Sequence, residues 1–76
     1  MSVNMKKLSL KTVIWKEGKY CIAQCLNVDV STFGKTKIEV TKNIKEALEL
    51  YFDGRNTKSI PKVLSPSLIQ TSVIYA

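Results

Sequence analysis

The chain has 76 residues, 45% of them hydrophobic, with twelve basic residues, six acidic residues and no histidine. This length supports a single hydrophobic core, so we expect one domain over residues 1–76. Without histidine or a distinct carboxylate pair, general acid–base catalysis is disfavoured, and we do not expect an enzyme.

The N-terminal stretch MSVNMKKLSLKTVIW has no uninterrupted apolar run of signal-peptide length. No later run approaches the length of a membrane span. We therefore expect a cytoplasmic protein that does not contact a membrane.

Two apolar segments, residues 8–15 and 20–26, flank the polar tetrapeptide Lys16-Glu17-Gly18-Lys19. This order predicts the two strands of a β-hairpin, with Glu17-Gly18 as a two-residue loop and glycine supplying a positive φ angle. In that register Trp15 faces Tyr20 across the hairpin.

Alternation along the two strands sorts their side chains onto two apolar faces. One face holds Leu10, Thr12, Ile14, Cys21, Ala23 and Cys25. Because several of these residues are small, we expect a helix to pack on this face. The other face holds the candidate interface for a partner or a second copy, namely Val13, Trp15, Tyr20 and Ile22. The alternative is that residues 54–67, or a helix on this opposite face, bury that patch within one chain.

The two cysteines, Cys21 and Cys25, lie in one predicted strand. Four residues of strand separate them by roughly 13 Å, too far for a disulfide. Two thiols without histidine do not make a zinc site within one chain. We expect both cysteines to act as small apolar residues, and we expect neither a metal nor another cofactor.

Residues 28–33 are rich in β-branched side chains and predict a third strand. A helix is predicted from about residue 36 to residue 53, where Thr36 and Glu39 form the capping-box pattern. Helical spacing then places one apolar stripe along it, made of Val40, Ile44, Ala47, Leu48 and Tyr51. Gly54 is well placed to end the helix.

Residues 54–67 contain both prolines and predict a connecting loop. Residues 68–75 alternate in the manner of a final strand. The predicted architecture is therefore an α+β fold of order β-β-β-α-β, with a single antiparallel sheet and one packed helix.

The tripeptide Gly34-Lys35-Thr36 is similar to the end of a P-loop, but that motif requires a glycine where this chain has Asp29. A nucleotide site is therefore not expected. A helix N-terminus can still attract an anion, and the possible contacts are Lys35, Thr36 and Lys37.

Residues 13–53 resemble the HicB family of antitoxin-like proteins. The resemblance rests on a first strand with a tight turn, Gly18-Lys19-Tyr20 leading to Ala23, Gly34-Lys35-Thr36 at the helix start, and Glu46-Ala47-Leu48 within the helix. It implies a degraded double-stranded-RNA-binding fold of the same β-β-β-α-β order. It also implies a non-catalytic protein that binds and masks a small RNA-cleaving toxin of the HicA type.

HicB-like proteins usually form dimers or larger assemblies. The resemblance therefore implies that this chain also binds itself, as a homodimer or a larger assembly. Many of them carry a C-terminal DNA-binding segment. Here the sequence ends at Ala76 after the predicted last strand, and we expect a stand-alone short form or oligomeric relative.

The alternative class is a small basic nucleic-acid-binding domain. In that case Lys11, Lys16 and Lys19 would bind phosphates beside aromatic stacking platforms at Trp15 and Tyr20. Eleven of the twelve basic residues are lysines and Arg55 is the one arginine, which disfavours sequence-specific base readout. We therefore expect nucleic acid to be the less favoured partner.

Overall fold

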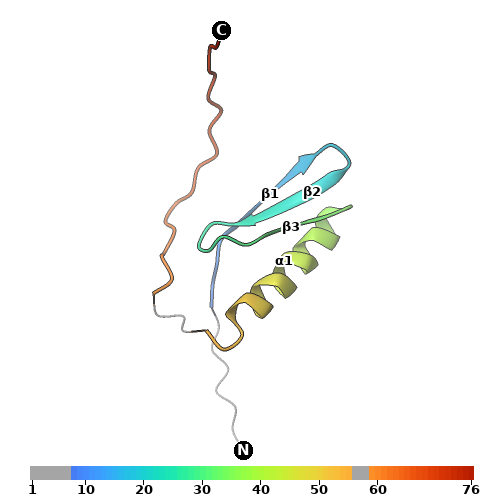
Figure 1. The fold of residues 1–76 in the computed structure, drawn as a ribbon, viewed down its shortest axis with the longest axis vertical. Helices are drawn as coiled ribbons and strands as arrows, with labels where there is room; N and C mark the ends of the chain where they lie inside the picture. Colours follow the sequence, from blue (N-terminus) through green and yellow to red (C-terminus); the bar gives the residue numbers. More distant parts are fainter. Residues whose placement is uncertain (1–7, 56–58) are drawn as a thin grey trace, which may run out of the picture.

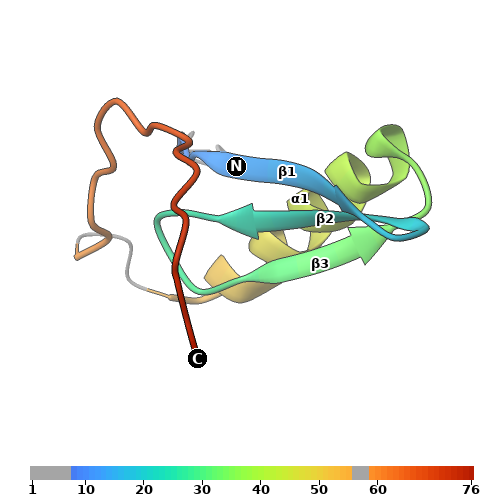
Figure 2. The ribbon, with the colours of Figure 1, turned by 90° about the horizontal axis from the view of Figure 1, so that it is seen from above.

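The computed structural model describes residues 8–55 and 59–76. Three strands and one helix follow one another as β1 (Thr12–Glu17), β2 (Tyr20–Cys25), β3 (Ser31–Gly34) and α1 (Lys37–Phe52). The strands form one antiparallel sheet of order β1-β2-β3, and α1 covers one of its faces (Figures 1 and 2). The predicted α+β fold, with a single antiparallel sheet and one packed helix, is confirmed over this part of the chain.

The β1–β2 hairpin differs from the prediction in its register. Glu17 pairs with Tyr20 and Trp15 pairs with Ile22, so the two-residue loop is Gly18-Lys19 rather than Glu17-Gly18. Gly18 has a φ angle of 60°, the positive value that the first loop position of a type II′ turn requires. The predicted loop would have put Glu17 at that position, where a side chain is strained.

The change of register leaves the two faces of the hairpin as predicted. Each residue of β1 meets a partner two positions further along β2 than expected, and two positions preserve the alternation of side chains. Ala23 and Cys25 are accordingly buried beneath α1, and Cys21 packs against the same core. The predicted role of both cysteines as small apolar residues on the helix side therefore holds.

Strand bounds also differ from the prediction. β1 begins at Thr12 rather than at residue 8, although pairing reaches one residue earlier through the bond from Leu26 N–H to the Lys11 carbonyl, 2.8 Å. β3 covers Ser31–Gly34 rather than residues 28–33. The chain turns before it, where Val30 N–H donates to the Val28 carbonyl.

Helix α1 begins and ends close to where its capping residues predict. Thr36 is the N-cap, and its hydroxyl accepts a hydrogen bond from Glu39 N–H at 3.0 Å. Gly54 follows the helix with a φ angle of 73°, and Arg55 N–H closes the last turn on the Phe52 carbonyl. The apolar stripe faces the sheet, because Val40 and Ile44 are buried and Leu48 packs against them.

The core lies between α1 and the strands β2 and β3, against which the helix packs. Gly34 makes this close approach possible. A Cβ atom added at Gly34 would lie 2.8 Å from the backbone nitrogen of Val40, closer than real contacts of this kind. At the outer edge of β3, the Asn43 side chain donates to the Phe33 carbonyl at 3.0 Å, so the helix also occupies that edge.

The chain after α1 is tied at two points to the end of the sheet away from the β1–β2 turn. Asn27 Nδ2 donates to the Pro61 carbonyl at 2.8 Å, and Lys11 Nζ donates to the Val63 carbonyl at 2.7 Å. The predicted loop over residues 54–67 belongs to no strand or helix where it is described, and its residues 56–58 lie outside the described ranges.

Residues 64–76, called the tail below, run away from the sheet and helix (Figure 1). The predicted final strand over residues 68–75 is not formed, since these residues pair with no strand and are exposed. Ile74 is 100% exposed and Leu68 is 91% exposed. A strand requires a neighbour for its backbone hydrogen bonds, and alternating sequence alone does not provide one.

Candidate partner-binding face

The face of the sheet opposite α1 is apolar and uncovered by the described residues. We call it the open face, and it consists of Val13, Trp15, Tyr20, Ile22 and Phe33. Val13 and Ile22 are half-buried, whereas Trp15 and Tyr20 are each 42% exposed. The four residues proposed from the sequence therefore lie together on one surface.

Phe33 is the member of the open face that the sequence prediction missed. It is 61% exposed and sits opposite Ile22, so Trp15, Ile22 and Phe33 form one row across all three strands. Tyr20 meets Phe33 edge to face, with ring centroids 5.5 Å apart. Alternation along residues 28–33 could have indicated Phe33, but only with the β2–β3 register known.

Strand pairing fixes the geometry of this face. Directly opposed residues on neighbouring strands hold their side chains about 5 Å apart, so the row is a continuous surface rather than scattered apolar residues. Edge-to-face packing restrains the rings of Tyr20 and Phe33 before any partner arrives. Glu17, Tyr20, Ile22 and Phe33 line a shallow hollow at the hairpin end of the face.

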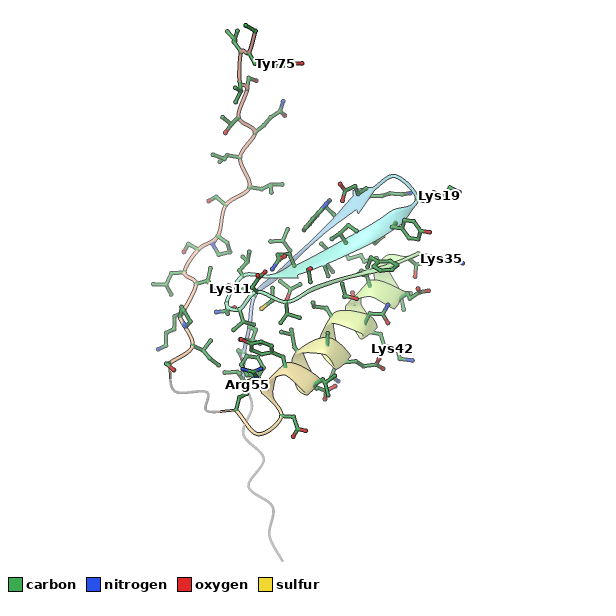
Figure 3. All side chains as sticks on the ribbon, in the orientation of Figure 1. Lys11, Lys19, Lys35, Lys42, Arg55 and Tyr75 are labelled. Atoms are coloured by element: carbon green, nitrogen blue, oxygen red, sulfur yellow. The ribbon has the colours of Figure 1, made fainter. Side chains whose placement is uncertain are left out.

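Within residues 8–55 and 59–76, the lysines around the open face do not form the basic strip that the alternative prediction requires. Lys16 is paired with Cys21, which places its side chain on the helix side of the sheet. Lys11 directs its ammonium group to the Val63 carbonyl. Lys19 stands in the hairpin loop and Lys35 at the end of β3, at one end of the sheet (Figure 3).

The N-terminus of α1 already contains ligands from its own chain. The Thr36 hydroxyl accepts from Glu39 N–H, and the Glu39 carboxylate accepts from Lys35 N–H at 3.3 Å. A carboxylate at this position competes with an external anion for the same donors. Lys35 and Lys37 are both exposed, and an anion contact with Lys35, Thr36 and Lys37 stays a prediction.

A second apolar surface lies between the outer edge of β1 and helix α1. Because α1 packs on β2 and β3, the helix side of β1 is left beside a groove of 490 Å³. We call this the β1 groove, and its apolar lining comes mainly from Leu8, Leu10, Ile14, Ile44, Leu48 and Phe52.

No protein-family model, curated protein or solved structure matches this chain. The resemblance to the HicB family accordingly remains a prediction from the residues that carry it. Helix α1, the one helix within residues 8–55 and 59–76, is neither long enough nor apolar enough to cross a membrane. In those same ranges, no group of three His, Cys, Asp or Glu side chains is arranged to hold a metal ion.

Proposed function

We propose that this chain is a non-catalytic protein-interaction domain that binds its partner through the open face. The observation that carries the proposal is the row of Trp15, Ile22 and Phe33 across the sheet, with Tyr20 packed on its end. Large exposed aromatic side chains grouped around an aliphatic centre are typical of the energetically dominant part of protein interfaces.

The resemblance to HicB antitoxins supplies the kind of partner, a small RNA-cleaving toxin of the HicA type. Binding to such a toxin would mask its active surface without chemistry on the antitoxin side. The open face suits this role because strand pairing and the contact between Tyr20 and Phe33 already order its side chains, which lowers the ordering cost of association. Self-association into a dimer or larger assembly is part of the same proposal.

Nucleic-acid binding is the less favoured function. A single-strand platform requires basic side chains beside the stacking aromatics. Two of the three lysines predicted for that role are directed elsewhere, because Lys16 lies on the helix side and Lys11 bonds to the Val63 carbonyl.

The proposal is tested by titrating the purified chain with the product of the adjacent reading frame, if that product has the size and single catalytic histidine of a HicA-type toxin. Isothermal titration calorimetry should give saturable binding. Trp15→Lys should weaken it by about 30-fold or more, as expected for an interface centre.

Ile38→Lys is the matched control. Ile38 is 85% exposed on α1, so the change introduces the same charge on the opposite side of the molecule. We expect less than about a threefold effect for this variant. Equal losses from the two variants, or toxin binding unaffected by Trp15→Lys, would contradict the assignment to the open face.

A further inference from the structure

The tail exposes a run of large apolar side chains to solvent. Six of its large apolar side chains are at least 75% exposed, namely Leu64, Leu68, Ile69, Val73, Ile74 and Tyr75. No charged side chain occurs from Val63 to Ala76, so burial of the tail requires no charged side chain to be desolvated. The Cα radius of gyration is 15.5 Å, against about 11 Å for a compact chain of this length.

The tail has the pattern of a strand that joins a sheet. Along residues 68–75 one side carries Ile69, Thr71, Val73 and Tyr75, all β-branched or aromatic. The other side has Gln70 and Ser72 at its centre. A strand with one apolar side and one mixed side is suited to a position where one side is buried.

The sheet has one edge where such a strand can be added. The Lys11 carbonyl faces β2, so alternation turns the backbone groups of Thr12, Ile14 and Lys16 toward the outer edge of β1. No described strand lies beside that edge. The β3 edge is shorter, and the Asn43 side chain already occupies the Phe33 carbonyl there.

The β1 groove lies directly under this free edge. A strand added beside β1 would point alternate side chains into the groove. There they would contact the apolar side chains of Leu10, Ile14 and Leu48, which line it. A nine-residue strand spans roughly 30 Å, which exceeds the roughly 20 Å of a six-residue strand such as β1. The tail is therefore long enough to cover the edge completely.

We propose that residues 67–75 of one copy add as a strand to the free edge of β1 in a second copy, with Ile69 and Val73 seated in its β1 groove. The exchange is reciprocal, so each copy gives a tail and receives one. The tail does not use the sheet of its own chain, since after the hydrogen bonds at Pro61 and Val63 it runs away from the sheet and helix (Figures 1 and 3). This contact rests on the self-association in the proposed function, but it uses neither the open face nor a toxin, so its failure is distinguishable from a failure of toxin binding.

The first test is the mass of the full chain by sedimentation equilibrium, with a paired set of tail variants. The wild-type chain should have the mass of two 8.6 kDa chains at micromolar concentration. Ile69→Lys combined with Val73→Lys should weaken dimerisation by about tenfold or more, because both changes place charge in the groove.

The matched control is Gln70→Lys combined with Ser72→Lys, which adds the same charge to the other side of the tail. We expect less than about a threefold effect from it. Equal losses from the two pairs, or a wild-type chain that remains monomeric at these concentrations, would overturn the proposal.

The second test identifies the acceptor surface. A mixture of isotope-labelled and unlabelled chains should give isotope-filtered nuclear Overhauser contacts between the methyl groups of Val73 in one copy and Ile14 in the other. Contacts found only within one chain would show a tail folded on its own sheet. Contacts to Trp15 alone would show a dimer through the open face. Either result would overturn the proposed exchange.

Discussion

The sheet and helix, residues 12–52 and called the body below, have a composition similar to that of the tail. The apolar residues of the body form a core, whereas those of the tail are exposed. Seven of the thirteen tail residues are hydrophobic, a share at least as high as the 45% of the whole chain. Ile44 in α1 is 5% exposed, whereas Ile74 in the tail is 100% exposed. Within one chain, apolar residues are therefore buried where consecutive elements supply a facing surface, as the hairpin and α1 do for each other.

The sharpest comparison makes the same substitution in both regions. Ile44→Ala should lower the free energy of unfolding by about 3 kcal/mol, because it leaves a cavity in a small core. Ile74→Ala should change it by less than about 0.5 kcal/mol in dilute solution, since the side chain contacts solvent. Urea unfolding followed by tryptophan fluorescence measures both values. Equal losses in dilute solution would show that the tail is packed within one chain.

A second prediction concerns the close approach inside the body. Gly34→Ala should cost about 2 kcal/mol, because the new methyl group meets the Val40 backbone and forces α1 away from β3. Gly18→Ala is the control, since its Cβ would meet no atom within 4 Å and only its positive φ angle opposes the change. That control should cost about 1 kcal/mol. Urea midpoints in the reverse order would contradict the packing described for Gly34.

Loss of the N-cap of α1 should lower the stability of the body by a smaller amount. Thr36→Ala removes the hydroxyl that accepts from Glu39 N–H and should cost about 1 kcal/mol. Thr41→Ala, in the first turns of the same helix, removes only a bond to the Lys37 carbonyl and should stay within about 0.5 kcal/mol of the wild type. Thermal unfolding followed by circular dichroism separates the two, and identical midpoints would exclude a capping role.

The smallest expected effect concerns the positive charge of the chain, none of whose basic residues lies in the tail. Binding to single- and double-stranded RNA should be undetectable at micromolar chain and about 150 mM salt, and binding at low salt should fall steeply as salt is added. A fluorescence anisotropy titration across salt concentrations measures this. Micromolar binding at the higher salt that Trp15→Ala abolishes would favour the nucleic-acid function instead.

Much of the body could be predicted because its signals are local. The Thr36 cap, the stripe through Val40 and Ile44, and the stop at Gly54 each depend on neighbouring residues. The two faces of the hairpin were also predictable, since the shift from a Glu17-Gly18 loop to a Gly18-Lys19 loop preserves alternation.

The features that sequence reasoning missed depend on non-local pairing. Phe33 joins the open face only because Cys25 N–H bonds to the Val30 carbonyl and sets the β2–β3 register. The tail alternates like a strand, yet whether it pairs depends on an available edge rather than on its own residues. The sequence therefore predicted the four open-face residues of the hairpin, but it did not predict Phe33, which β3 supplies.

The strictly sequential order of β1, β2, β3 and α1 has a consequence for the timing of folding. Each element packs on one that precedes it closely in the chain, and such local topologies fold quickly. During synthesis, every element of the body is translated before the tail. We therefore expect the body to close on itself first, leaving the tail to reach its final position in a slower step whose rate depends on chain concentration.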